Sequence, residues 1–282
     1  MNSFVPIKYR YAFRIEYKGE HFFGWQRQQI QPTVQEVVEN HLKIILKPLA
    51  PTHWNDNRVL IEGSGRTDTG VNAYGQMAHF DSPILFNTHK IISSLNFFLR
   101  PYESSITWMG QVPSDFHARF SAISRSYVYE ILNTQYERRV QSSSAWHIDK
   151  PLDLDAMKMA AEHLVGRHDF ESFRDQQCQA KSAIRNIDVF NIKEHQGLIQ
   201  FYVKSKSFLH HQIRIMVGTL THVGLGKLSP DDIPIILEKK HRKFAGPTAP
   251  AGALIFLGPT YSEHYKIPPL NKLWTKENDL KF

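Results

Sequence analysis

Two hydrophobic periodicities alternate along this chain, and no other feature restricts its fold as strongly. Apolar and charged side chains alternate over residues 10–17, which predicts a strand with one buried face. Residues 33–45 instead carry apolar side chains at helical spacing, and they begin with Thr33 and Glu36, the pair expected in a capping box. Strands and helices that follow one another in this way indicate an α/β protein.

The same alternation continues through the rest of the chain. Further strands are predicted over residues 58–61, 106–112, 127–131 and 199–203. Further helices are predicted over residues 91–99, 153–164 and 208–225, with a short one opened by Ser229-Pro230. The order of elements restarts after Pro113, so we expect two α/β domains, residues 1–113 and 114–282.

Composition narrows the function classes. The hydrophobic fraction of 41% is ordinary for a chain with a folded core, and the formal net charge of +7 favours an anionic partner. Cys178 is the one cysteine among 282 residues, which excludes an internal disulfide and a cysteine-based zinc site. The first residues contain no apolar signal-peptide core, and no apolar stretch is long enough to span a membrane. We expect a soluble, cytoplasmic protein.

A glycine-rich segment, residues 63–73, follows one of the predicted strands. Its glycines let the backbone approach a ligand closely, and Arg66 and Asp68 share a face if the segment is extended. A phosphate-binding loop would need a Gly-Lys-Ser/Thr ending, which the segment lacks. A dinucleotide-binding turn would need glycine where Asp68 stands, and a carboxylate there would repel a phosphate.

Asp68-Thr69-Gly70 also matches the Asp-Thr-Gly motif of aspartic proteases. Those enzymes pair two carboxylates that share one proton. The sequence carries one such motif, so a protease would have to be a homodimer. Arg66 beside the pair would favour two ionised carboxylates, which opposes the shared proton. A dimeric protease is therefore the weaker alternative.

Residues 65–71, Gly-Arg-Thr-Asp-Thr-Gly-Val, resemble the Gly-Arg-Thr-Asp-Ala-Gly-Val signature of the bacterial tRNA pseudouridine synthase A family. Further blocks resemble the same family in the family's order, between about residue 11 and residue 258. They are Tyr17-Lys18-Gly19 with Gly24-Trp25-Gln26-Arg27-Gln28, residues 115–122 with residues 125–129, residues 169–174, His210-His211-Gln212-Ile213-Arg214 and residues 248–251. Six ordered blocks are more specific than any single motif.

This resemblance implies the catalytic residues. Pseudouridine formation breaks the N-glycosidic bond of a uridine and rejoins the base through C5, so no atoms are gained or lost and no cofactor is needed. Asp68 corresponds to the family's catalytic carboxylate, taken here as the nucleophile, although the sequence leaves attack at C1′, addition to C6 and proton removal open. Arg214 corresponds to the arginine that pairs with this carboxylate. Arg66 would hold the backbone or the displaced base, and Tyr127 would stack on the uracil.

The resemblance also implies that basic and aromatic side chains contact RNA. The first candidates are Arg27, Arg119, Arg125, His210 and His211. The wider set comprises Lys181, Arg185, Lys204, Lys206 and residues 239–243, with Trp25, Tyr127 and Phe208 as interleaved aromatics. Adjacent histidines cannot easily face one metal ion from a helix, and no carboxylate follows them at helical spacing, so we expect no metal site.

The family departs from this sequence at Thr69 and Asn72, where it has alanine and histidine, and neither position is catalytic in it. The implied fold is the pseudouridine synthase fold, with two α/β domains, a mixed, mainly antiparallel sheet and a basic cleft between the domains. The implied assembly is a symmetric dimer, and the implied substrates are uridines at positions thirty-eight to forty of the tRNA anticodon stem-loop. A tRNA-binding or chaperone protein of the same fold without catalysis is the competing class.

Overall fold

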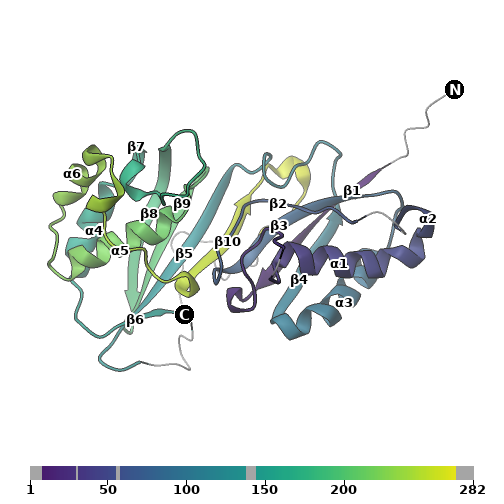
Figure 1. Cartoon of the computed structure of the whole chain (residues 1–282), viewed down its shortest axis with the longest axis horizontal. Helices are drawn as coiled ribbons and strands as arrows, with labels where there is room; N and C mark the ends of the chain where they lie inside the picture. Colours follow the sequence, from purple (N-terminus) through teal and green to yellow (C-terminus); the bar gives the residue numbers. More distant parts are fainter. Residues whose placement is uncertain (1–7, 30, 55–57, 138–143, 271–282) are drawn as a thin grey trace. The chain divides into compact units, whose positions relative to one another are not determined.

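The computed structural model describes residues 8–29, 31–54, 58–137 and 144–270. The chain divides into two compact units, Met1–Ile123 with Phe256–Phe282 and Ser124–Ile255. Each unit combines helices with mainly antiparallel strands, which confirms the predicted α/β class (Figure 1). Within the described ranges, no helix combines the length and the apolar character that a membrane crossing requires.

The strands of the first unit follow the order β4-β1-β3-β10, with β2 paired to β3, and the first two residues of β10 belong to the second unit. The strands are β1 (Tyr9–Tyr17), β2 (Glu62–Gly63), β3 (Asn72–Ser82), β4 (Ser104–Gln111) and β10 (Leu254–Thr260). Strand β1 is antiparallel to both β3 and β4, and β2 is antiparallel to β3. The sequence patterns predicted β1 and β4 but not β3, the longest strand of this unit.

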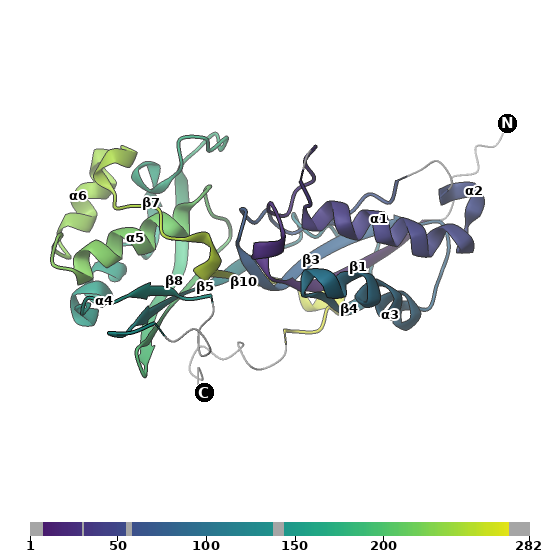
Figure 2. The same cartoon turned by 60° about the horizontal axis from the view of Figure 1, so that its bottom comes forward.

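Two helices of the first unit, α1 (Val34–Leu46) and α3 (Thr88–Leu99), pack side by side (Figures 1 and 2), and the short helix α2 (Pro51–Trp54) follows α1. Both long helices were predicted. The Thr33 hydroxyl accepts the Glu36 N–H at 3.3 Å, which is the N-cap half of the predicted capping box. The Glu36 carboxylate pairs with the Arg27 guanidinium at 3.1 Å.

Strand β1 is buried on both faces, whereas its alternating pattern predicted one. Tyr11, Phe13 and Ile15 form the expected buried face. On the opposite face, Ala12 belongs to a second apolar cluster, and the Arg14 guanidinium donates to the carbonyl groups of Pro268 and Pro269. The residues packed around Ala12 are Met77, Val112, Phe116 and Ala118, with Trp108, Tyr261, Tyr265 and Ile267 around them. Segments distant in sequence therefore cover the face of β1 that its charged residues predicted to be exposed.

The strand predicted over residues 58–61 was wrong, because strand pairing begins only at Glu62. Side chains of helix α1 satisfy the backbone of this segment instead. Glu39 accepts the Ile61 N–H at 3.2 Å, and the Gln35 amide donates to the Ile61 carbonyl at 3.1 Å. The segment runs along the helix, which leaves Leu60 60% exposed.

The second unit has the strand order β5-β9-β8-β7, and β6 pairs in parallel with β5. The strands are β5 (Ser124–Asn133), β6 (Trp146–Ile148), β7 (Gly166–Asp169), β8 (Ile184–His195) and β9 (Leu198–Ser205). The two strands predicted here from alternation are direct neighbours, with Tyr127 opposite Val203 and Tyr129 opposite Phe201. The β5–β6 pair is parallel and β5–β9, β8–β9 and β7–β8 are antiparallel, so the strands are mixed but mainly antiparallel, as expected.

The helices of the second unit are α4 (Leu154–Glu162), α5 (Gln212–Gly224) and α6 (Asp232–Lys239), and α4 packs against α5. Asp153 caps α4 as predicted, since its carboxylate accepts the Ala156 N–H at 2.9 Å. Helix α6 begins at Asp232 and not directly after Ser229-Pro230, because the Ser229 hydroxyl donates to the Asp232 carboxylate in a preceding turn.

Candidate active site

Asp68 lies in the loop that joins β2 to β3, in the first unit. The loop alternates in exposure: Thr67 is buried, Asp68 is half-buried, and Arg66 and Thr69 are exposed. Gly70 has a φ of +81°, so glycine permits the turn that brings the chain from Asp68 into β3. The loop thus presents its carboxylate at the surface while the preceding residue is anchored in the core.

The N-terminal block of the sequence forms one wall of this loop. The Thr67 carbonyl accepts the Trp25 N–H at 3.1 Å, and the Thr67 hydroxyl shares a buried hydrogen bond of 2.8 Å with the Tyr17 hydroxyl. Gly24, with a φ of +85°, lies so close that a Cβ there would come 2.7 Å from the Thr67 carbonyl oxygen. Close backbone approach explains why this block carries glycine beside the Asp68 loop.

A second set of contacts comes from β3. The Ser64 N–H donates to the Met77 carbonyl at 2.7 Å, and the Ser64 hydroxyl donates to Gln76 at 2.6 Å. The Gln76 amide then donates to the Gly65 carbonyl at 2.8 Å. Gln76 is fully buried, and its side-chain oxygen and nitrogen both form hydrogen bonds with the part of the loop that precedes Asp68.

The two departures from the family pattern lie on this loop and at the first residue of the strand that follows it, Thr69 on the loop and Asn72 at the start of β3. Asn72 fixes the position of the segment around Gly19, because its side-chain oxygen accepts the Gly19 N–H at 2.8 Å. A Cβ on Gly19 would come 2.3 Å from the Gly70 carbonyl carbon, so this contact joins two closely packed backbones. The Thr69 side chain is exposed, and its size has no packing consequence in the described structure.

Tyr127 lies on β5 in the second unit and is 9% exposed. Its ring meets the Phe208 ring edge to face, with centroids 5.3 Å apart. Tyr129, two residues on, has a structural position: its hydroxyl donates to the Pro250 carbonyl at 2.9 Å, and burial raises the pKa of its phenol. Tyr129 also meets the rings of Trp146 and Phe201 edge to face, so what distinguishes the two tyrosines is that Tyr129 is fully buried while Tyr127 retains a small exposed fraction.

Arg214 is the third residue of α5 and is half-buried, as its flanking apolar residues predicted. Its Nε donates to the Ala249 carbonyl at 2.8 Å, while the Ala249 N–H donates to the Arg214 carbonyl at 3.1 Å. The block of residues 248–251 that resembles the family therefore fixes the plane of this guanidinium. Arg66 and Asp68 belong to the first unit, and Tyr127 and Arg214 belong to the second.

His210 and His211 precede α5, and their rings stack with centroids 3.9 Å apart. His211 Nδ1 lies 2.9 Å from Oδ2 of Asp175, a residue that no sequence motif singled out. No spacing rule could have found this pair, because the two residues are 36 positions apart.

The predicted RNA-contacting arginines have different surroundings. Arg27 bonds to the fully buried carboxylate of Glu39 at 3.1 Å, in addition to Glu36. Arg125 donates to the Lys206 carbonyl at 2.6 Å. The Arg119 guanidinium lies 5.6 Å from the ring centroid of Phe120, which is 76% exposed. Of these three arginines, Arg119 is the one shown beside an exposed ring, and Lys239 and Lys243 lie over the exposed ring of Phe244 in the same way.

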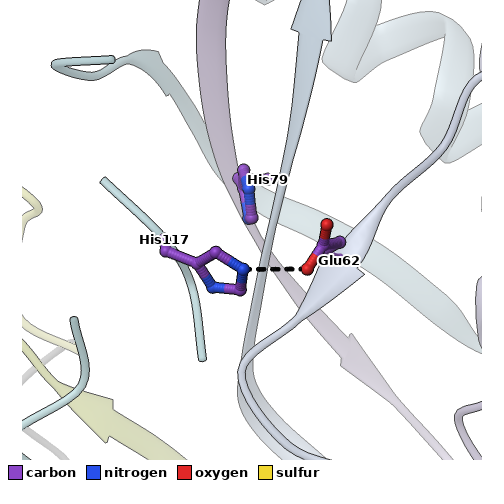
Figure 3. Close-up of side chains that lie close together, drawn as sticks. All are labelled: Glu62, His79 and His117. Atoms are coloured by element: carbon purple, nitrogen blue, oxygen red, sulfur yellow. Dashed lines mark ion pairs between the residues drawn. The ribbon is translucent and has the colours of Figure 1, made fainter. Parts of the chain in front are cut away.

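Glu62, His79 and His117 of the first unit lie close enough together to suggest a metal centre (Figure 3). One ligand atom of each lies within 4.8 Å of the others. Burial, assisted by the charge of Arg10, lowers the pKa of His79 to about 4, so its ring is neutral at pH 7. Two histidines and a carboxylate are a ligand set that zinc accepts.

The hydrogen bonds around both rings oppose metal binding. The Ala118 N–H donates to Nδ1 of His79 at 3.3 Å, and the Arg119 N–H donates to Nδ1 of His117 at 3.2 Å. A neutral ring that accepts at Nδ1 carries its proton on Nε2, and Nε2 of His117 lies 2.9 Å from the Glu62 carboxylate. Histidines bound to metals show the reverse pattern, in which the second nitrogen donates. We interpret this cluster as an anchor for the segment that carries Arg119.

The family model described as tRNA pseudouridine synthase matches residues 14–121 and 160–262. A tRNA pseudouridine synthase A of Paramagnetospirillum magneticum is 40% identical over 253 residues, which cover 90% of this chain and 95% of the relative. The protein of the same name from Sinorhizobium fredii is 42% identical over 254 residues, covering 89% and 99%. A chain of a solved Cbf5-Nop10-Gar1 complex gives a TM-score of 0.31 at 14% identity, covering 76% of this chain and 44% of its own, a likeness too weak to bear on the fold.

Proposed function

The chain belongs to the tRNA pseudouridine synthase A family, and from this premise we propose that it isomerises uridine to pseudouridine at positions thirty-eight, thirty-nine and forty of the tRNA anticodon stem-loop. The reaction class follows from the family. The choice of stem-loop positions follows from the six residue blocks, which resemble the bacterial enzymes throughout the chain.

The observation that carries this proposal is how firmly the Asp68 loop is held. Thr67 is fixed through both its carbonyl and its hydroxyl, and Ser64 and Gly65 are fixed by β3. A catalytic carboxylate must be held close to its productive geometry before the substrate binds. Otherwise part of the substrate's binding free energy orders the carboxylate instead of lowering the activation barrier. We assign Asp68 as the nucleophile.

Three other residues complete the proposed site. Arg214 would hold the Asp68 carboxylate ionised, since an arginine within about 4–6 Å typically lowers an Asp pKa by one to three units. Arg66, exposed on the same loop, would hold the RNA backbone or the displaced base. Tyr127 would stack on the uracil once the base has left its helical stack. The isomerisation itself requires no cofactor, because it neither adds nor removes atoms.

The proposed partner is the tRNA anticodon stem-loop, bound by a homodimer in the cytoplasm. The net charge of +7 favours a polyanion, and phosphate contacts supply much of the affinity of such complexes. Arg119 and Arg125 lead the proposed contacts, together with His210 and His211. We propose that the N-terminal domain supplies the Asp68 loop and that the C-terminal domain supplies Tyr127 and Arg214.

The test is to incubate the protein with unmodified tRNA and to map pseudouridine by carbodiimide labelling. After reaction with the wild-type protein, pseudouridine is expected at positions thirty-eight to forty. Asp68→Ala is expected to form no pseudouridine while it retains its affinity for tRNA. Asp188→Asn, an exposed carboxylate on β8, is the matched control. An Asp68→Ala variant within tenfold of the wild-type rate would remove Asp68 from the chemistry.

The same assay separates the competing classes. A non-catalytic tRNA-binding protein would bind the tRNA tightly without producing pseudouridine in any wild-type reaction. A dimeric Asp-Thr-Gly protease would leave the tRNA unchanged and would cleave a peptide library instead. Labelling at uridines outside the anticodon stem-loop would retain the isomerase and overturn the proposed positions.

A further inference from the structure

A run of basic residues, 239–243, begins at the last residue of α6. The fold uses two of its cations. The Lys240 ammonium group pairs with the Asp169 carboxylate at the end of β7, at 3.1 Å. The Arg242 guanidinium is partly buried and donates to the Gly246 carbonyl at 2.8 Å. These two side chains therefore attach the run to β7 and to the segment that precedes β10.

The other two cations of the run lie over one exposed ring. The Lys239 ammonium nitrogen lies 5.8 Å from the ring centroid of Phe244, and the Lys243 nitrogen lies 5.0 Å from it. Both lysines are exposed, and the phenylalanine is 41% exposed. Neither ammonium group forms an ion pair with any carboxylate in the described part of the chain. We call Lys239, Lys243 and Phe244 the lysine patch.

The charges of the lysine patch favour an anion. Two ammonium groups beside one ring repel each other, and at an exposed site the attraction of each to the ring is weak. A phosphate between them would remove this repulsion and accept charge-assisted hydrogen bonds from both. The ammonium groups lie over the ring, where a base would have to stack. The patch is therefore suited to the phosphate backbone of a nucleic acid and not to a base.

The segment that follows the lysine patch is fixed to α5, the helix that carries Arg214. The Gly246 N–H donates to the Thr219 hydroxyl at 2.9 Å, and Ala249 exchanges hydrogen bonds with Arg214 through its N–H and its carbonyl. The two attachment points on α5 are separated by roughly 7.5 Å of helix, at a rise of about 1.5 Å per residue. A phosphate at the patch would therefore be held in a fixed relation to Arg214, within one unit.

We propose that Lys239 and Lys243, held over the ring of Phe244, bind a backbone phosphate of the tRNA and so dock it on the unit that carries Arg214. This inference rests on the proposed function, because its ligand is tRNA. Phe244 is a positioning residue, which acts through the two lysines. Phosphate contacts read no sequence, so the patch should contribute equally to the affinity for different tRNAs.

Removal of the two charges tests the contact. Lys239→Gln and Lys243→Gln are combined in the Asp68→Asn background, and the Kd for an unmodified tRNA is measured over a range of salt concentrations. Affinity should fall several-fold, up to about tenfold, and the log–log salt slope should become shallower by about 0.7–0.9 for one lost phosphate. The control combines Lys158→Gln with Lys193→Gln, which removes two exposed lysines of the same unit and should leave the Kd unchanged.

Ethylation interference identifies the phosphate directly. Each phosphate of the tRNA is ethylated at low frequency, and the positions at which ethylation prevents binding are compared between the parent and the Lys239→Gln, Lys243→Gln variant. At least one phosphate whose ethylation weakens binding to the parent should have no effect on the variant. The remaining interfering positions should be the same for both proteins, because the other contacts are retained.

Substitution of Phe244 tests its positioning role. Phe244→Leu removes the ring and keeps both charges, and it should weaken binding about two- to fivefold, as the loss of an exposed cation–π contact predicts. It should have no further effect once both lysines are glutamine. Phe244→Tyr keeps the ring and should bind as the parent does. An equal loss from Phe244→Leu in the glutamine variant would overturn the positioning role.

A glutamine variant with the Kd, the salt slope and the interference pattern of the parent would overturn the proposal. All three substituted side chains are exposed, and urea denaturation checks that each variant is folded. If the wild type forms no pseudouridine while the lysine patch still governs tRNA binding, the proposed function fails and this inference stands. If pseudouridine forms at the expected positions and the glutamine variant binds as the parent does, the proposed function stands and this inference fails.

Discussion

Tyr17 and Thr67 share a buried hydrogen bond of 2.8 Å between their hydroxyl groups, although they are 50 residues apart in the sequence. Thr67 directly precedes the proposed catalytic carboxylate, and Tyr17 ends strand β1. Together with Gln76, Tyr17 therefore connects the core of the first unit to the loop that carries Asp68. This relationship connects the stability of the unit with the geometry of its proposed site.

Replacing Tyr17 with phenylalanine should affect both properties. The ring packing is retained, but the Thr67 hydroxyl is left buried without this partner, which typically costs about 1–3 kcal/mol of the free energy of unfolding. We expect a several-fold slower single-turnover rate with an unchanged tRNA Kd, because the loop loses order before it loses RNA contacts. Tyr9→Phe, at the start of the same strand, is the control. An unchanged rate alongside a measurable loss of stability would confine Tyr17 to a packing role.

The buried histidine of β3 makes a prediction about acid stability. The pKa of His79 is about 4 in the folded protein, whereas an unfolded histidine titrates near 6.5. Between about pH 6.5 and pH 4, His79 binds a proton in the unfolded chain but stays neutral in the folded one. The free energy of unfolding therefore falls as the pH drops through this range. The contribution of this one group is on the order of 2–3 kcal/mol.

Urea denaturation at several pH values checks this expectation. His79→Gln should show a shallower fall than wild type over that pH range, since glutamine has no proton to gain. His89→Gln, an exposed histidine at the start of α3, should follow the wild-type curve. Equal slopes for wild type and His79→Gln would contradict the buried neutral ring.

Chelation tests the interpretation of the Glu62, His79 and His117 cluster. Because the backbone donates to Nδ1 of both rings, the cluster should not hold zinc, and exhaustive dialysis against a chelator should leave pseudouridine formation unchanged. Refolding the tRNA with magnesium before each assay removes the effect of magnesium on the RNA itself. A loss of activity that zinc restores and magnesium does not would show that the histidines bind a metal.

The sequence predicts those elements whose stabilising contacts lie within the element itself or with a strand of the same alternating pattern. The strands over residues 127–131 and 199–203 were found from alternation, and they pair in the register that puts their apolar residues together. Thr33 and Asp153 cap the helices that their positions predicted. In each case the stabilising contact lies within the element or with a strand of the same pattern.

The elements that were missed depend on contacts from distant parts of the chain. Strand β3 has no clean alternation, because Gln76 and His79 are buried polar residues whose partners lie in other segments. Residues 58–61 have a strand-like composition, but helix α1 takes both backbone hydrogen bonds of Ile61, the last residue of the segment. Asp175 belongs to no motif, and only the folded chain brings it to His211. Sequence patterns report the side chains of a segment and not the segments that meet them.

Tyr127 allows stacking and proton chemistry to be separated. Tyr127→Phe keeps the ring and removes the hydroxyl, whereas Tyr127→Leu removes both. Stacking of a base on an aromatic ring is worth about 1–3 kcal/mol, and general acid–base participation contributes about 10²–10⁴-fold in rate. We expect Tyr127→Phe to slow the single-turnover rate severely with tRNA affinity nearly unchanged, and Tyr127→Leu to be no faster and to capture the flipped base less well.

Tyr202→Phe is the matched control for these measurements, because Tyr202 is a β9 tyrosine whose hydroxyl shares a 3.1 Å hydrogen bond with Ser126. It should retain the wild-type rate, which would show that losing a strand hydroxyl in this unit does not by itself slow the reaction. If Tyr127→Phe also keeps the wild-type rate, the hydroxyl has no part in the chemistry and Tyr127 is a stacking platform. If Tyr127→Leu behaves like wild type as well, the ring has a packing role, as in its contact with Phe208, and Tyr127 does not belong to the site.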